Sequence, residues 1–396
     1  MTGASSSRAE VSHARRIVVK VGSAVLTKDG ELRRRVFGDV ARQIAELCDG
    51  GREVVLVSSG AIAVGSRDLG WTNPGESIPE KQAAASVGQI GLIELYKKHF
   101  ARSGRHVGQI LVTRRGLEER ERFLNARHTL FTLLRTGVVP IVNENDTVAT
   151  DEILFGDNDN LSATVVNLVG ADLLVILTDV DGLYVERPEP GRPAPDRYDV
   201  VEEITPEIAR AAGGSETAFG RGGMTTKLEA ARAARACGAS TVLANGRRRD
   251  VLLAIGAGEP VGTLFLAGSR LASRKHWLAF TTRTRGALEI DEGAVRALVD
   301  RGKSLLPAGV KAVRGKFGIG DAVACVDVRG VEVARGLSAY GSDAIARIAG
   351  LSTAKIAEVL GYSNGNEVIH RDDLVLLDPA VSPPDAAFPG SPESAS

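Results

Sequence analysis

The sequence predicts an α/β fold, with a mostly parallel sheet covered by helices on both faces, followed by a small β-rich module. Up to about residue 265, apolar strand-like runs alternate with helix-like segments, which is typical of parallel sheets. After about residue 275, short strand signals are separated by glycine turns. The length of 396 residues also exceeds that of one typical domain.

The composition excludes several classes of protein. Hydrophobic content is 43%, charged content is 25% and formal net charge is zero, so no overall basic field indicates nucleic acid or a membrane. No apolar run is long enough to cross a membrane, and the polar N-terminus lacks the apolar segment of a secretory signal. The scattered Cys48, Cys237 and Cys325 favour reduced thiols in a cytoplasmic protein over disulfides or a metal site.

Five regions are expected along the chain. They are a disordered tail at 1–14, an α/β domain at 15–265, a linker at 266–284, the β-rich module at 285–376 and a second disordered tail at 377–396. The last tail is dominated by Pro, Ser and Ala, a composition that cannot form a packed core.

The first expected strand, residues 17–23, contains Lys20 in a run of β-branched residues. A lysine there is costly to bury without a partner, and the alternative is an edge strand that lets Lys20 extend into solvent. The second strand, 53–57, runs into Ser59 and Gly60, where a helix should begin. Free N–H groups at a helix start make an anion site, although the same residues also serve as a plain helix cap.

The other elements alternate in the same way. Helices are expected at 34–48, 81–100, 118–135, 161–169, 205–212, 227–237 and 251–255, and strands at 107–112, 138–142, 172–178 and 240–244. In the β-rich module, strands are expected at 288–290, 312–313, 322–326 and 331–334, and helices at 292–300, 342–349 and 352–360. Ligands of parallel sheets collect at the carboxyl ends of the strands. The residues expected to converge there are Lys20, Ser59, 143–146, Thr178 and Asp179.

Two clusters of short polar side chains flank one segment in the middle of the chain. Residues 143–146 (Asn-Glu-Asn-Asp) follow a strand, and residues 157–160 (Asp-Asn-Asp-Asn) precede a helix. Such clusters suit a small zwitterionic ligand or a phosphate-bound metal, and the alternative is two turns and a helix cap.

A glycine-rich loop at 220–227 ends in two threonines and Lys227 at a helix start. Its backbone N–H groups are suited to phosphates, and the alternative is a flexible linker. The spacing is not that of a Walker A loop, and no Gly-x-Gly-x-x-Gly opens the first βα unit, which disfavours a dinucleotide enzyme.

Lys20 and Lys227, held by Asp159, supply the charge neutralisation that phosphoryl transfer needs, with Mg²⁺ carried by a nucleotide. The six histidines show no metal-binding spacing.

Together these stretches resemble the amino acid kinase family, and the likeness extends from about residue 15 to 375. The matching segments are 18–23 (Val-Val-Lys-Val-Gly-Ser), 58–63 (Ser-Ser-Gly-Ala-Ile-Ala), 121–127 (Glu-Arg-Phe-Leu-Asn-Ala-Arg), 143–150 (Asn-Glu-Asn-Asp-Thr-Val-Ala-Thr), 156–163 (Gly-Asp-Asn-Asp-Asn-Leu-Ser-Ala), 177–179 (Leu-Thr-Asp) and 222–227 (Gly-Gly-Met-Thr-Thr-Lys). The resemblance implies an eight-stranded, mainly parallel sheet between helices.

The resemblance is closest to bacterial members that move the γ-phosphate of ATP to the side-chain carboxylate of L-glutamate, the first step toward proline. It implies that Lys20 and Lys227 stabilise the phosphoryl group, that Asp159 orients them, and that Gly22 and Gly60 lend backbone N–H groups. The implied glutamate site is Ser59, Asp146 and Asn158. The implied ATP site is Lys20, Thr178, Asp179, Arg221, Gly222, Gly223, Met224, Thr225, Thr226 and Lys227. Arg221 stands where relatives often carry a small hydroxyl residue, which makes that contact less secure.

The β-rich module resembles a PUA domain through residues 286–290, 291–294, 304–310 and 370–373. PUA domains often bind RNA, but without a basic excess a structural or regulatory role is preferred. The family also implies feedback inhibition by proline and a homo-oligomer. The alternative functions are a related kinase with a different acid or phosphate acceptor, and an RNA-binding protein that uses the PUA-like module.

Overall fold

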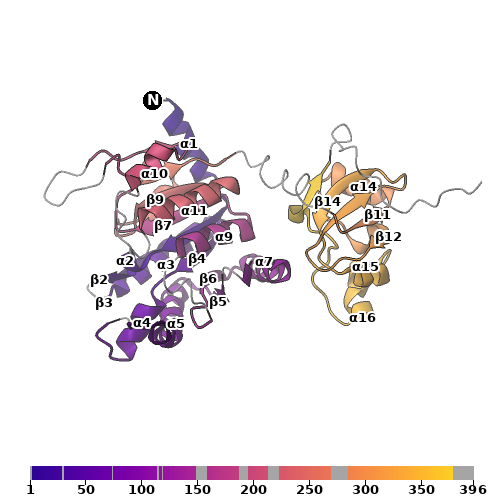
Figure 1. The fold of residues 1–396 in the computed structure, drawn as a ribbon. Coiled ribbons are helices and arrows are strands. Elements are labelled where there is room, and N and C mark those ends of the chain that lie inside the picture. Colours follow the sequence, from indigo (N-terminus) through magenta and orange to yellow (C-terminus); the bar gives the residue numbers. More distant parts are fainter. Residues whose placement is uncertain are drawn as a thin grey trace, which may run out of the picture. The chain divides into compact units, whose positions relative to one another are not determined.

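The computed structural model describes residues 2–28, 31–73, 75–113, 116–117, 119–148, 158–186, 195–212, 223–268 and 284–377. The chain forms two compact units, Met1–Ser273 and Arg274–Ser396, each of which is described by itself (Figure 1). The predicted tail at 377–396 therefore lies outside the described residues, apart from Leu377.

The first unit is built on an eight-stranded sheet. From one edge to the other the strands are β5 (Val107–Val112), β6 (Val139–Glu144), β4 (Glu53–Ser58), β1 (Arg16–Val21), β7 (Leu173–Thr178), β9 (Ser240–Asn245), β10 (Thr263–Phe265) and β8 (Val200–Val201). Neighbouring strands are parallel except for β9 and β10. This confirms the predicted fold class, although β8 and β10 are too short to have been expected from the sequence.

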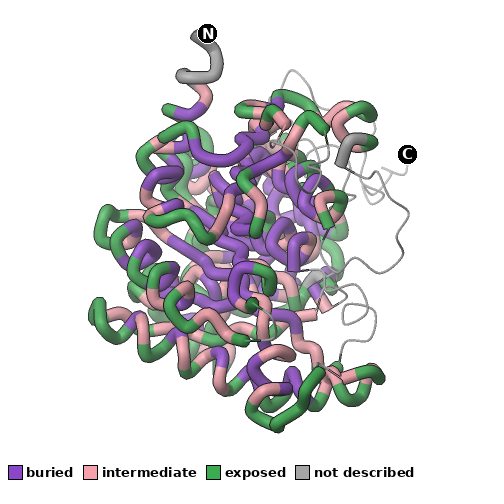
Figure 2. Tube along the Cα trace, turned by 90° about the vertical axis from the view of Figure 1, so that its left-hand side faces the viewer, coloured by how far each residue is buried: buried purple, intermediate pink, exposed green. Residues whose placement is uncertain are grey.

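Helices cover both faces of this sheet (Figure 1). The face that we name the α5 face is covered by α1 (Thr2–Ser12), α2 (Ser23–Leu26), α3 (Arg34–Asp49), α4 (Ala61–Asp68), α5 (Ile78–Phe100) and α12 (Val251–Gly256). The opposite face, named the α9 face, is covered by α7 (Arg120–Arg135), α9 (Asn158–Val169), α10 (Pro206–Ala212) and α11 (Met224–Ala236). A two-stranded ribbon of β2 (Thr27–Lys28) and β3 (Glu31–Leu32) and a short 3₁₀ turn (Ala101–Ser103) complete the unit. Figure 2 shows buried runs along the central strands and exposed residues on the outer helix turns.

The alternation of side chains along β1 determines where Lys20 points. Ile17, Val19 and Val21 pack in the α5-face core, whereas Val18 packs in the α9-face core. Because side chains of a strand alternate between faces, Lys20 lies on the same face as Val18, beneath α9 and α11. The edge-strand alternative for Lys20 is wrong, since β1 lies between β4 and β7 and Lys20 is only 4% exposed.

The N-terminal segment corrects one prediction. Residues 1–14 were expected to be disordered, but Thr2–Ser12 form α1, and Arg8 is 5% exposed. The Arg8 guanidinium donates to the Asp199 carboxylate at 2.6 Å and to the carbonyls of Val261 and Gly262 at 3.0 and 2.9 Å. These tertiary bonds order a segment whose own sequence has little helix-forming amphipathicity.

Two helices begin earlier than expected, and both differences affect the site. The helix predicted at 161–169 begins at Asn158, and the helix predicted at 227–237 begins at Met224, with Gly223 as its N-cap. Asn158, Asp159 and Thr226 therefore lie in first helical turns, where their positions are fixed by helix geometry.

The second unit contains a five-stranded sheet in the order β12 (Val310–Gly315), β11 (Gly286–Ile290), β13 (Ala322–Val326), β14 (Glu332–Leu337) and β15 (Leu374–Leu376). Its helices are α14 (Glu292–Val299), α15 (Ser342–Ile348) and α16 (Ile356–Leu360), with 3₁₀ turns at Pro307–Gly309, Thr353–Lys355 and Arg371–Asp373. Leu288, Val323 and Ile345 share one core that includes both sheet and helix residues. The predicted β-rich module is confirmed. In neither unit do the described helices include one with the length and apolar character needed to cross a membrane.

Candidate active site

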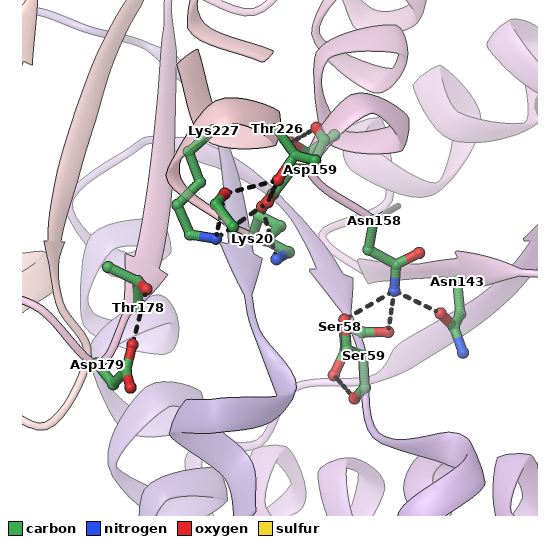
Figure 3. A network of polar contacts seen from close by, with 12 residues as sticks. Lys20, Ser58, Ser59, Asn143, Asn158, Asp159, Thr178, Asp179, Thr226 and Lys227 are labelled. Atoms are coloured by element: carbon green, nitrogen blue, oxygen red, sulfur yellow. Dashed lines mark hydrogen bonds and ion pairs between the residues drawn. The ribbon is translucent and has the colours of Figure 1, made fainter. Parts of the chain in front are cut away.

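The carboxyl ends of six parallel strands meet at one edge of the sheet, and α9 and α11 begin beside it. Lys20 comes from β1, Asp159 from α9 and Lys227 from α11. The Lys20 ammonium lies 2.6 Å from Oδ1 of Asp159, and the Lys227 ammonium lies 3.2 Å from Oδ2 (Figure 3). The predicted meeting of two distant lysines on one carboxylate is therefore observed.

The three charged side chains of this ion triad are all buried. Side-chain exposure is 6% for Lys20, 8% for Lys227 and 1% for Asp159. Burial by itself would raise the pKa of Asp159, but the two ammonium charges and hydrogen bonds from Lys20 and Thr226 more than offset it and lower that pKa. Two positive charges and one negative charge leave the triad with one net positive charge, which suits an anionic ligand.

The first turn of α11 holds Lys227 in place. Thr226 donates its hydroxyl to Oδ2 of Asp159 at 2.7 Å and to the carbonyl of Gly223 at 2.8 Å. Lys227 also donates to the Gly223 carbonyl at 3.4 Å. Thr226 therefore orients Asp159, while its expected contact with ATP stays a prediction.

Gly22 corrects a further prediction. Its N–H was expected to contact phosphate, but it donates to the carbonyl of Leu177 at 3.2 Å. A Cβ at Gly22 would lie 3.3 Å from the Lys20 ammonium. The glycine therefore leaves room for the Lys20 side chain.

A second cluster, named the amide relay, consists of Asn158, Asn143 and Gln89. Nδ2 of Asn158 donates to Oγ of Ser59 at 2.9 Å, to the carbonyl of Ser58 at 3.3 Å and to Oδ1 of Asn143 at 3.0 Å (Figure 3). Nδ2 of Asn143 in turn donates to Oε1 of Gln89 at 2.9 Å. Asn158 and Asp159 are consecutive, so the start of α9 joins the amide relay to the lysine triad.

The side chain of Ser58 connects the end of β4 to the α5-face core. Its hydroxyl lies 2.9 Å from the hydroxyl of Tyr96, which is fully buried. Burial raises the pKa of Tyr96, so this phenol stays neutral and acts only as a hydrogen-bond partner. The pair fixes the strand end from which Ser59 projects.

The first turn of α4 faces the same sheet edge. Gly60 is its N-cap and adopts φ 108°, a conformation that favours glycine, and as a glycine it offers no side chain to cap the helix. The first N–H groups of a helix lack intrahelical acceptors and attract anions. The Gly60 position thus agrees with the predicted anion site.

On the other side of β1, Thr178 ends β7 and Asp179 follows it, and the Thr178 hydroxyl donates to the Asp179 carboxylate at 3.2 Å. Thr225 lies exposed in the first turn of α11 beside half-buried Met224. Asp146 is half-buried in the turn after β6. Arg221 and Gly222 lie outside the described residues, so their predicted ATP contacts stay predictions.

Gln89 is a site residue that the sequence reasoning missed. It lies in a stripe with Ala85, Leu92 and Tyr96, which are all buried. Their spacing of three and four residues marks one helix face, so a glutamine in this apolar stripe was the available signal.

The profile of the amino acid kinase family matches residues 15–245, more than half of the chain. The chain belongs to the amino acid kinase family. The PUA domain profile matches residues 286–360.

Individual relatives of this family member match most of the chain. "Glutamate 5-kinase" from Syntrophotalea carbinolica is 49% identical over 92% of this chain and 98% of its own length. The protein of the same name from Geobacter sulfurreducens is 51% identical over 93% of this chain and 99% of its own length. Among solved structures, carbamate kinase from Giardia lamblia bound to AMP-PNP aligns with 65% of this chain at 16% identity and a TM-score of 0.46, too distant to bear on function.

Proposed function

We propose that this amino acid kinase transfers the γ-phosphate of ATP to the side-chain carboxylate of L-glutamate, giving L-glutamyl 5-phosphate. The proposal is supported by relatives of about 50% identity that carry the name glutamate 5-kinase over nearly the whole chain. It is also supported by a site whose parts suit an anionic phosphoryl group on one side and an amino acid on the other.

The observation that carries the proposal is the buried triad of Lys20, Asp159 and Lys227. In the reaction, a carboxylate oxygen of the substrate bonds to the γ-phosphorus while the bond to the bridging oxygen of ADP breaks. A carboxylate is already ionised at neutral pH, so the nucleophile needs no general base. The main requirement is positive charge around the moving phosphoryl group, and two preorganised ammonium groups in a water-poor site supply it.

The nucleotide is assigned to the side of β7 and α11. The triphosphate would lie between Lys20 and the first turn of α11, where Thr225 and Lys227 are placed to meet its oxygens. Thr178 and Asp179, at the end of β7, would contact the rest of the nucleotide. Mg²⁺ would be held by the phosphates of ATP and would neutralise part of their charge. The Asp159 carboxylate already bonds two lysines and Thr226, so it acts as their counter-ion and not as a metal ligand.

Glutamate is assigned to the side of β4 and β6. Asp146 would pair with the substrate ammonium, while Ser59 and Asn158 would hydrogen-bond its polar groups. The uncapped first turn of α4, at Gly60, favours a carboxylate nearby. Proline inhibition and a homo-oligomer stay predictions from the family resemblance.

The test is ATP consumption with L-glutamate, with hydroxylamine present to trap the activated carboxyl group as a hydroxamate. The proposal expects hydroxamate in step with ADP, and a strong preference for glutamate in a panel of amino acids and small acids. ADP formation with another acceptor from the panel, and none with glutamate, would assign the chain to a different kinase of the family.

A further inference from the structure

Gln89 carries a feature that the packing of α5 does not explain. Its side chain is 8% exposed, and its Nε2 has no hydrogen-bond partner in the described part of the chain. A buried donor without a partner is destabilising, so packing alone would favour an apolar residue of similar size. The other end of the amide does have a partner, because Oε1 accepts a hydrogen bond from Asn143.

The direction of every bond in the amide relay is fixed by a backbone carbonyl. The Ser58 carbonyl can only accept, so the Asn158 atom that lies 3.3 Å from it is the nitrogen. That nitrogen also donates to Oδ1 of Asn143, which turns the Asn143 nitrogen toward Gln89. Oε1 of Gln89 is the acceptor at the end of the relay, and without it the Asn143 amide would be held within the relay only by the bond from Asn158.

This polarity determines what Asn158 and Ser59 present to a ligand. The two N–H protons of Asn158 are shared among three acceptors, so its Oδ1 is the atom left to accept a hydrogen bond. The Ser59 hydroxyl accepts from Asn158 and keeps its own proton for donation. An acceptor beside a donor matches the ammonium and carboxylate groups of an amino acid.

The backbone of α5 is held firmly beside this site. A Cβ at Gly88 would lie 1.9 Å from the Ala61 carbonyl oxygen and 2.3 Å from the Gly65 nitrogen, so α5 touches the first turns of α4 at the residue before Gln89. Because the two helices are in backbone contact there, Gln89 is a rigid support for Asn143.

We propose that Gln89 is a positioning residue that selects an amino-acid acceptor: through Asn143, it reinforces the orientation of Asn158 that the Ser58 carbonyl sets, in which Oδ1 faces the substrate ammonium. The inference rests on the proposed function, and it adds a residue that does not touch the reacting atoms. The inference predicts that replacing Gln89 weakens the binding of ligands that carry an ammonium group and leaves the binding of ligands without one unchanged.

The test compares Gln89→Met with the wild type in steady-state kinetics. The KM for glutamate is expected to rise roughly tenfold, the effect of one lost hydrogen bond in the relay. The KM for ATP should stay within about twofold, since the nucleotide is assigned to the other side of β1. Glutarate, which is glutamate without its amino group, should inhibit both proteins with the same Ki.

Gln43→Met is the matched control. Gln43 is also a buried glutamine of an α5-face helix, and both ends of its amide are bonded, to the Asp39 carbonyl and the Leu252 N–H. This variant should lose thermal stability without a change in either KM. Gln89→Asn, which keeps the amide but is one methylene too short for Asn143, should reproduce the kinetic effect of Gln89→Met and serves if that variant folds poorly.

Equal weakening of glutamate and glutarate by both Gln89 variants would overturn the inference, as would an unchanged KM for glutamate in folded protein. A wild-type chain that forms no hydroxamate from glutamate would instead refute the proposed function, so the two failures are distinguishable.

Discussion

The substitution Lys227→Met tests the lysine triad, because it removes one ammonium group and keeps most of the side-chain volume. Lys227 is 7% exposed, and its ammonium group bonds Asp159 at 3.2 Å and the Gly223 carbonyl at 3.4 Å. In the variant, Asp159 still bonds Lys20 and Thr226, so its carboxylate remains paired. The net charge of the triad falls from plus one to zero.

Two magnitudes follow from this geometry. The free energy of unfolding should fall by only about 1–3 kcal/mol, since the variant loses charge-assisted hydrogen bonds without leaving Asp159 unpaired. Turnover should fall roughly 10²- to 10³-fold, equivalent to about 3–4 kcal/mol of transition-state stabilisation, as when one preorganised donor is removed from a developing charge.

The assay is hydroxamate formation at saturating ATP and glutamate, together with urea unfolding. Lys97→Met, a matched change at an exposed lysine of α5, should alter neither quantity. A kcat of the folded Lys227→Met protein within about threefold of wild type would refute the reasoning. If the substitution raised only the KM for ATP and left kcat unchanged, Lys227 would bind ATP without stabilising the transition state.

Four further substitutions test other parts of the first unit. Asp159→Asn leaves two buried ammonium groups without their counter-ion, so the free energy of unfolding in urea should fall by about 3–5 kcal/mol at pH 7. Because the pKa of Asp159 is lowered from 3.8, its stabilisation is present above that pH and is lost on acidification, so the difference in urea unfolding between wild type and variant should shrink below about pH 4. Arg8→Ala should cost about 2–3 kcal/mol in urea unfolding, because it removes bonds to buried carbonyls, whereas Asp199→Asn should cost about 0.5 kcal/mol, because the Asp199 side chain is 48% exposed. Gly88→Ala should cost about 3 kcal/mol in thermal unfolding and raise the KM for glutamate, because the added methyl group would push the start of α4 away from Ser59.

Local sequence patterns were sufficient for most of the helices and central strands and for the meeting of the two lysines. Runs such as 53–57 and 107–112 are apolar and β-branched, and the helices between them are amphipathic, so element type followed from periodicity. Parallel strands place their carboxyl ends at one edge of the sheet, which predicts that Lys20 and Thr178 lie at one site. Charge pairing made Asp159 the expected partner of the two lysines, and the family resemblance implied that it orients them.

The sequence did not predict features that depend on contacts between distant segments. The helix at Thr2–Ser12 is held by bonds from Arg8 to residues about 190 to 255 positions away, and no local signal reports such bonds. For the same reason, the sequence did not predict that the Gly22 N–H donates to the Leu177 carbonyl. It also did not predict that Gln89 lies at the end of the amide relay.

The sequence by itself determined the residue chemistry of this protein: two lysines, one carboxylate, a glycine-rich loop and a set of short amides, each attached to a recognisable strand end or helix start. Only the tertiary structure decided which atoms face each other, because hydrogen-bond direction depends on where a fixed carbonyl such as that of Ser58 comes to lie. The orientation of Asn158, and with it the atom offered to a substrate, is set by hydrogen bonds across four elements, between residues that lie 15 to 100 positions apart in the chain.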